Sequence, residues 1–263
     1  MAIQEVKRDT SGLRLLVEHF LGSNWGVILS DVSAGTAGNT ERLAFVYDKR
    51  RVSPSGLVGE IVLPPTPEGN PQDQFARIPY IVGFKVGGQN FVLLTAHIKY
   101  GTVPEDRLAE IQSLARCTAA EIRDRANTPS SEEKNLIVLG DFNIDKRGDN
   151  PLFQAFVSTG LKIPPQLNNL KTTLNTDPKY YDQIGWFMDQ DFELQYTERA
   201  GTIDFVDAIF KELSSGSMTY RISDHFPLWV EFHTDRSVEQ MALKLGLEEH
   251  QIAMPDPLQI VPD

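Results

Sequence analysis

Hydrophobic positions fall mostly into short runs separated by polar or glycine- and proline-rich stretches, a pattern that favours β-strands. The clearest feature is a hairpin, in which the runs 78–86 and 90–98 meet at Gly87-Gly88. Paired glycines tolerate the positive φ angles of a tight turn. By the same pattern we expect strands at residues 2–6, 25–29, 43–47, 136–139, 181–187, 203–209 and 228–232.

Apolar residues at helical spacing interrupt these runs. Thr10 or Ser11 can cap an amphipathic helix that stops at Gly22, and Pro104 opens the longest helix. A short helix begins at Pro151. Mostly antiparallel strands with interspersed helices predict an α+β fold, in which two mixed sheets pack face to face and helices lie outside.

The pattern predicts one domain with a C-terminal extension. The 263 residues fit a single large domain, and the core pattern ends near residue 233. We therefore assign residues 1–234 to the domain, and residues 235–263 to an extension with an amphipathic helix at 238–247 and a proline-containing tail. The sequence contains neither an apolar run near the ~20 residues of a membrane helix nor a secretory signal at its start. We expect a monomer with no stable membrane association.

The composition of the chain excludes some kinds of binding site. The formal net charge of −11 excludes a protein that binds nucleic acid through uniform basicity. It does not exclude a nuclease, because metal-binding carboxylates count fully in that sum. The single cysteine, Cys117, excludes an internal disulfide framework and a cysteine-rich zinc site. One cysteine slightly favours a cytoplasmic enzyme, and a disulfide-free exported protein is the alternative.

Three segments each place oxygen or imidazole groups at the end of an apolar run, namely Ile3-Gln4-Glu5, residues 139–143 (LGDFN) and residues 222–227 (ISDHFP). Magnesium prefers a few carboxylates, keeps several waters and completes its shell with phosphate oxygens. Each segment alone also has a structural explanation, since a Gly-Asp-Phe-Asn turn can simply close a strand through side-chain hydrogen bonds. Together they predict a site for Mg²⁺, with Mn²⁺ as a substitute.

These segments resemble a known family. Gln4-Glu5, Gly140-Asp141-Phe142-Asn143 and Ser223-Asp224-His225 are similar to the ordered signatures of the endonuclease/exonuclease/phosphatase superfamily. The resemblance extends over nearly the whole chain to about Phe232. It implies a four-layered α/β sandwich and a divalent-metal-dependent phosphodiester hydrolase that uses in-line attack of water.

Four further positions resemble the deoxyribonuclease I branch of that superfamily: Glu41, Arg77, His97 and Asp182. Each also has a structural explanation, such as a surface ion pair of Glu41, a buried structural role for His97 or a strand-edge charge at Asp182. The resemblance implies that Glu41 holds His97 and that Asp182 holds His225, because a carboxylate fixes the tautomer and raises the basicity of an imidazole.

The resemblance also assigns a role to each candidate residue. It implies that the metal binds to Glu5 and Asp224, and that the substrate phosphate binds to Arg77 and Asn143. The catalytic residues that it implies are His97, His225, Asp141, Asn143, Asp182 and Glu41.

The sequence is compatible with more than one class of substrate. The grouping of His97, Glu41 and Arg77 favours a DNA endonuclease, while a phosphomonoesterase or a lipid phosphodiesterase, of the inositol phosphatase or sphingomyelinase type, would use the same core. The family carries an Asn on a first strand that precedes the Gln-Glu strand. Because Gln4-Glu5 lies at the start of this sequence, we expect that strand to be missing. A third reading is therefore a catalytically impaired binding module.

Overall fold

The computed structural model of the chain describes residues 1–33, 40–119, 135–174, 177–188, 192–235, 241 and 244–246. Its central element is a six-stranded sheet with one parallel pair, β6 and β7, among antiparallel ones. In spatial order its strands are β4 (Ser53–Glu60), β5 (Tyr80–Val86), β6 (Gln89–His97), β7 (Leu136–Asp141), β9 (Asp182–Phe187) and β8 (Leu161–Lys162).

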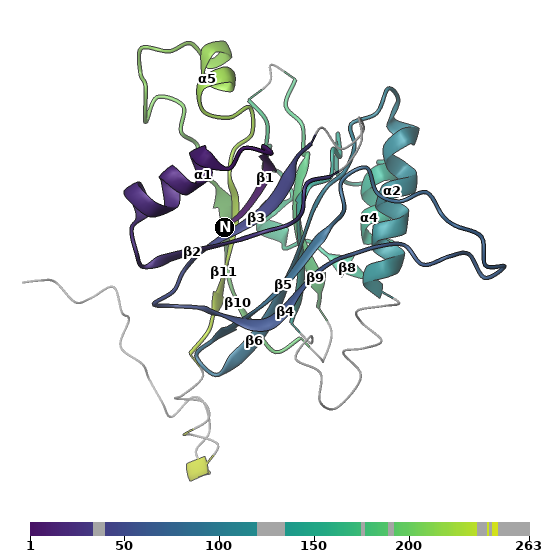
Figure 1. Cartoon of the computed structure of the whole chain (residues 1–263), viewed down its shortest axis with the longest axis horizontal. Helices are drawn as coiled ribbons and strands as arrows, with labels where there is room; N and C mark the ends of the chain where they lie inside the picture. The colour runs from purple at the N-terminus through teal and green to yellow at the C-terminus, as the bar shows by residue number, and fades with distance from the viewer. Residues whose placement is uncertain are drawn as a thin grey trace, which may run out of the picture.

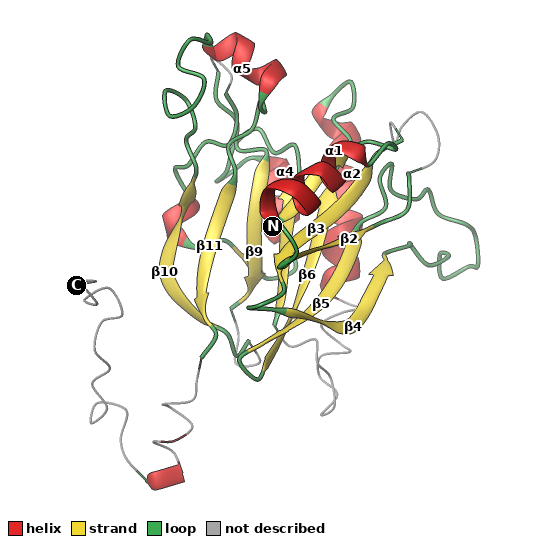
Figure 2. Cartoon of the chain, turned by 60° about the vertical axis from the view of Figure 1, so that its left-hand side comes forward, coloured by secondary structure: helices red, strands yellow, loops and turns green. Residues whose placement is uncertain are grey.

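Two smaller antiparallel sheets lie on one face of the central sheet (Figure 2). One has the order β1 (Ala2–Val6), β3 (Arg42–Asp48) and β2 (Trp25–Leu29), and the other pairs β10 (Gln195–Thr202) with β11 (Leu228–His233). Strand β1 contacts β6 and β7, and β11 contacts β9. The small sheets therefore form a second β-layer over the middle of the first.

Helices form the outer layers (Figure 1). Helices α2 (Pro104–Cys117) and α4 (Pro151–Val157) pack on the other face of the central sheet. Helix α1 (Ser11–Leu15) continues as the π-helix η1 (Leu16–Leu21) beside β2, and α5 (Ser215–Arg221) and the 3₁₀ turn η3 (Pro165–Leu167) lie in connections. This arrangement confirms the predicted four-layered α/β sandwich. No helix among the described residues is long and apolar enough to cross a membrane.

Successive side chains of the central strands point to opposite faces of the sheet, which explains why both faces are covered. In β5, Ile81 packs with the helices, whereas Tyr80, Val82 and Phe84 pack against the β3 side chains. Successive side chains of a strand point to opposite faces, so a continuous apolar run needs partners on both. The core is divided accordingly, with one cluster under α2 and α4 and two clusters between the β-layers, one at each small sheet.

The strand predicted at residues 203–209 was wrong. The structure places β10 before this segment, and residues 203–209 form a loop with turns. The amide of Val206 donates to Asp204 Oδ1, the amide of Ala208 donates to the carbonyl of Phe205, and Asp207 has a φ of 62°. These local hydrogen bonds take the place of the backbone hydrogen bonds that a strand forms with a neighbouring strand. The predicted C-terminal helix at 238–247 and the tail lie almost wholly outside the described residues.

The predicted helix of residues 11–21 is present, and it ends at Gly22, whose φ is 82°. Its burial differs from the expectation. Only Val17 is buried, and the side chains of Leu15, Leu16 and Phe20 are exposed. An amphipathic pattern sets the spacing of apolar residues, but the neighbouring layer decides how many of them are covered.

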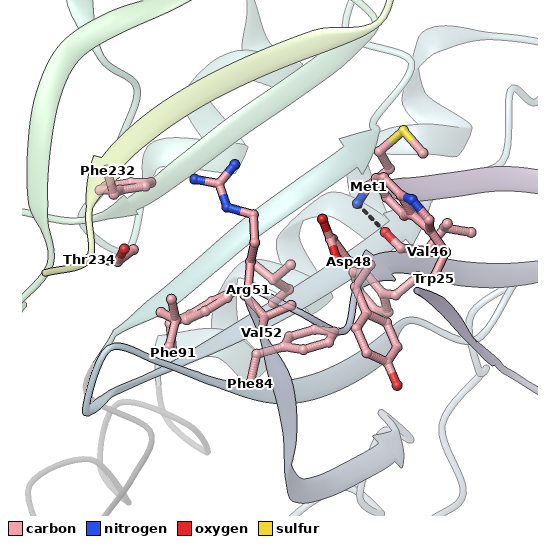
Figure 3. Close-up of a pocket in the computed structure, with 14 residues that line it drawn as sticks. Met1, Trp25, Val46, Asp48, Arg51, Val52, Phe84, Phe91, Phe232 and Thr234 are labelled. Atoms are coloured by element: carbon pink, nitrogen blue, oxygen red, sulfur yellow. Dashed lines mark hydrogen bonds between the residues drawn. The ribbon is translucent and has the colours of Figure 1, made fainter. Parts of the chain in front are cut away.

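An apolar cavity of about 350 Å³ separates the two small sheets (Figure 3). Within the described chain, β1 pairs with β3 alone and β11 pairs with β10 alone. The cavity lies between these sheets, with Phe84 and Phe91 of the central sheet on one side and Phe232 and Thr234 at the β11 end. The Met1 ammonium group lies at its margin and donates to the carbonyl of Val46. The missing first strand stays a prediction.

We predict that a longer chain, in which an apolar strand precedes Met1, melts at a higher temperature than the 263-residue chain. Such a strand would pair with the edges of β1 and β11 and cover the apolar cavity, so the longer chain would gain backbone hydrogen bonds and buried apolar surface. Thermal melts of the two chains check this. A control extension of the same length, rich in Gly and Ser, should leave the melting temperature unchanged. Equal melting temperatures for all three chains would contradict the prediction.

Candidate active site

Three neighbouring strands of the central sheet carry a row of candidate residues at the same end of the sheet. Strands β6 and β7 run parallel and place His97 opposite Asp141. Strand β9 runs antiparallel to β7 and places Asp182 opposite Asp141. The row needs close strand approach, since a Cβ at Gly140 would lie 2.1 Å from the carbonyl oxygen of Ala96. Sheet pairing thus collects side chains that are far apart in sequence at one edge.

The turn after β7 is held by the candidate residues themselves. The amide of Asn143 donates to Asp141 Oδ1 over 2.8 Å, and Asn143 has a φ of 52°. The Asn143 side chain donates through Nδ2 to the carbonyl of Ile98 over 2.7 Å. The amide nitrogen is therefore fixed against the β6 end, which orients the amide oxygen the other way. The hydrogen bond to the Asp141 side chain is the one expected if the turn merely closes the strand, and it also fixes the geometry of the site.

Asp182 and His225 form a close carboxylate–imidazole pair. His225 Nδ1 lies 2.8 Å from Asp182 Oδ2. The His225 loop is fixed beside β9 because Thr173 forms an isolated bridge with His225, and the Phe226 amide donates to the Thr172 carbonyl. Burial alone would lower the pKa of His225, but the hydrogen bond and charge of Asp182, with the charges of Asp141 and Asp224, raise it to about 9. His225 is thus protonated at neutral pH.

A second pair lies on the other side of Asp141. His97 Nδ1 lies 3.2 Å from Glu41 Oε2, and His97 Nε2 lies 3.5 Å from Asp141 Oδ2. The Arg77 Nε donates to Glu41 Oε2 over 2.6 Å. Burial disfavours the Glu41 carboxylate, yet close contacts with His97 and Arg77 outweigh burial and lower its pKa to about 2. Here Arg77, the predicted phosphate ligand, is buried and bound to Glu41.

Asp141 lies between the two pairs and is buried. Burial and the neighbouring charge of Asp182 raise its pKa to about 6, against the opposing influence of His97, His225 and the Asn143 amide. A group with a pKa near neutrality can exchange a proton with a reacting atom. A carboxyl whose pKa lies near neutrality therefore stands at the centre of the row.

The two predicted metal ligands lie at the margin of this cluster. Glu5 is exposed at a bulge in β1 and has a φ of 57°, while the side chain of Gln4 donates to Thr95 Oγ1 and holds β1 over β6. Asp224 is exposed next to His225. In the described part of the chain, no three His, Cys, Asp or Glu side chains are grouped to hold a metal ion.

Sequence reasoning missed a buried arginine under the site. Arg107 on α2 donates through an Nη atom to the carbonyl of Asn143 and to Asp145 Oδ2, and through Nε to the carbonyl of Tyr100. A signal for it was present in the sequence. Arg107 shares the buried face of α2 with Ile111 and Leu114, at helical spacing, and a buried charge needs a partner.

No protein-family model matches the chain. A deoxyribonuclease from Thioalkalivibrio sp. (strain K90mix) is 27% identical over 260 residues, which cover 95% of this chain and 67% of that protein.

Solved structures share the fold at lower identity. An endonuclease/exonuclease/phosphatase from Bacteroides vulgatus has a TM-score of 0.57 at 16% identity, over 89% of this chain and 84% of that one. TDP2 from D. rerio, complexed with a single-strand DNA product, has a TM-score of 0.57 at 14% identity, over 89% and 85%. A mannosyl-6-phosphatase from Bacteroides thetaiotaomicron has a TM-score of 0.55 at 17% identity, over 88% and 84%. The chain therefore has the endonuclease/exonuclease/phosphatase fold, which confirms the resemblance predicted from its motifs.

We predict that Glu41→Gln destabilises the protein by about 3 kcal/mol at pH 7, because it leaves the Arg77 guanidinium buried without its carboxylate. The folded-state pKa of Glu41 lies below its ordinary value of 4.5, so its stabilisation is complete above about pH 4.5 and is lost as the pH falls towards 2. Chemical denaturation from pH 7 to pH 3 measures the difference between the two proteins. It should shrink in acid, and the exposed Glu105→Gln serves as control. A difference that is constant with pH would contradict the prediction.

Proposed function

We propose that the chain is a divalent-metal-dependent phosphodiester hydrolase and that it acts on DNA as an endonuclease. The single observation that carries this proposal is the arrangement around Asp141, which has the His97–Glu41 pair on one side and the His225–Asp182 pair on the other. Two imidazole groups that flank a buried carboxyl suit a reaction in which one oxygen loses a proton and another gains one.

The geometry supports in-line displacement at phosphorus. A water oxygen forms the new bond to phosphorus while the bond to the leaving sugar oxygen breaks. Asp141, with a pKa of about 6, accepts the proton of the water, and Asn143 orients the water and the phosphate. His225, which is protonated at neutral pH, donates its proton to the leaving oxygen, and Asp182 holds the ring in place. His97 lies against Asp141 and positions it from the other side.

We propose Mg²⁺ as the cofactor, with Mn²⁺ as a substitute. The donor chemistry fits, because a magnesium site uses one or two carboxylates and keeps several waters, so it does not need three grouped protein ligands. Asp141, Asp182 and Asp224 concentrate negative charge around His225, and a cation would offset that charge. Glu5 and Asp224 are the residues proposed to hold it. When bound, the ion would neutralise charge on the phosphate.

DNA is favoured as substrate by two comparisons. The curated relative is named a deoxyribonuclease, and the TDP2 structure with the same fold is complexed with a single-strand DNA product. The mannosyl-6-phosphatase with the same fold supports a second candidate, a phosphomonoesterase. The fold alone does not choose between them, since one fold can host several chemistries.

The proposed function is tested with three substrates and added Mg²⁺: supercoiled plasmid, bis(p-nitrophenyl) phosphate and p-nitrophenyl phosphate. We expect nicked plasmid and hydrolysis of the diester. Preferred hydrolysis of the monoester would identify a phosphomonoesterase. Hydrolysis of none of the three, by a protein that is folded by circular dichroism, would replace the proposed function with the binding module.

A further inference from the structure

A row of three rings leads from the proposed reaction centre to the surface. The His225 and Tyr181 ring centroids are 5.8 Å apart, and those of Tyr181 and Tyr100 are 6.1 Å apart. Tyr100 follows His97, the last residue of β6, by three positions, so it extends the edge at which the candidate residues meet. The proposed function uses His225 but gives no role to Tyr100.

Tyr100 combines exposure with a fixed position. It is 56% exposed, although the Arg107 guanidinium lies over its ring at 4.2 Å from the centroid. Arg107 is itself buried and bound to the Asn143 carbonyl and to Asp145. The ring is therefore supported from one side by a group anchored in the β7 turn, and it keeps an open surface away from Arg107. Burial and a hydrogen bond with Tyr100 raise the pKa of Tyr181, which ties the two phenols together.

Two cations lie in the neighbourhood of the ring, and each is paired with a carboxylate. The Lys179 ammonium group lies 3.9 Å from Asp145 Oδ1, and Asp145 is the carboxylate that Arg107 contacts. The Lys179 ammonium group also lies 2.7 Å from Asp177 Oδ2, so Lys179 and Arg107 bring two cations to this region together with the carboxylates of Asp145 and Asp177. Cations beside an exposed aromatic ring are the combination with which proteins hold single-stranded nucleic acid, the ring contacting a base and the cations its phosphates.

We propose that Tyr100 is a stacking platform for the nucleobase next to the scissile phosphate, and that the substrate region is consequently single-stranded or locally unpaired. The inference rests on the proposed function, because it places a nucleotide at the same site. A base paired inside a duplex is stacked on its neighbours and does not offer its face to Tyr100. The platform therefore selects nucleic acid whose flanking base is unstacked.

A purely structural role is the competing explanation. In that case Tyr100 only covers the Arg107 guanidinium, and its removal would disturb the β7 turn for every substrate alike. The two roles differ in their dependence on the base. Stacking needs a base opposite the ring, whereas a structural role does not.

The test measures binding by fluorescence anisotropy in EDTA, with a labelled single-stranded oligodeoxynucleotide and the same strand carrying tetrahydrofuran abasic positions. Tyr100→Ala should weaken binding of the intact strand by about tenfold, within the range of one lost base–aromatic stack, and Tyr100→Phe should bind like the unmodified protein. On the abasic strand, the unmodified protein and Tyr100→Ala should bind equally. Phe20→Ala, at a residue 76% exposed on η1, is the matched control and should change neither affinity.

Three results would overturn the proposal. One is an equal loss of affinity for intact and abasic strands in Tyr100→Ala, which identifies the structural role. Another is a Tyr100→Ala protein that binds the intact strand as well as the unmodified protein does. The third is a preference of the unmodified protein for fully paired duplex over single strand of the same length. Failure of the proposed function shows instead as absent hydrolysis in Mg²⁺, so the two failures are distinguishable.

Discussion

His225→Ala lowers the turnover number for plasmid nicking by about 10²–10⁴-fold, the usual contribution of a positioned acid or base. The physical reason is the loss of the protonated imidazole that Asp182 holds at 2.8 Å, which leaves the departing oxygen without a proton donor. Initial rates at saturating DNA measure the effect. His233→Ala, at an exposed histidine at the end of β11, is the matched control and should keep the original rate.

Two further substitutions refine this expectation. His97→Ala should also cost about 10²–10⁴-fold, and the double variant should lose less than the product of the two, because both residues act on one transition state. In Asp182→Asn the main influence that raises the pKa of His225 is gone, so the alkaline limb of the turnover profile should move below its expected position near pH 9. Unchanged turnover in His225→Ala would remove His225 from the chemistry.

Excess EDTA abolishes nicking to the level of a protein-free control, and Mg²⁺ or Mn²⁺ added beyond the chelator restores it. The expectation follows from the acidic residues at the site margin, Glu5 and Asp224, and from the hard-oxygen preference of these ions. Agarose-gel assays of supercoiled plasmid measure the loss and the recovery.

The chelator experiment has an internal control. Circular dichroism in EDTA should match that in Mg²⁺, which shows that the lost activity does not come from unfolding. Glu5→Gln and Asp224→Asn should each raise the Mg²⁺ concentration needed for half-maximal nicking, whereas Glu105→Gln should not. Nicking that persists in excess EDTA would contradict the metal-dependent mechanism.

Local sequence patterns were sufficient where one element carries its own signal. The strands at 2–6 and 25–29 have the predicted bounds, and the hairpin turns at Gly87-Gly88 as expected. Period-two burial and turn chemistry depend on neighbouring residues, which the sequence displays directly. Strand β4 had no such signal. It contains Pro54, Gly56 and Gly59, and it forms a strand because the free edge of β5 offers hydrogen-bond partners.

What the sequence by itself determined is the kind of chemistry available: strand-end acids and imidazoles in a recognisable order, and an α+β sandwich to carry them. Only the tertiary structure decided which of these groups meet. The row of His97, Asp141 and Asp182 exists because β7 pairs with β6 on one side and with β9 on the other. A local sequence pattern does not indicate which strands will pair. The same holds for the Arg107 support of Tyr100, which joins a helix to a strand end. Pairing and packing are settled by contacts between distant segments, and these contacts set the charges, burial and pKa values on which the proposed reaction depends.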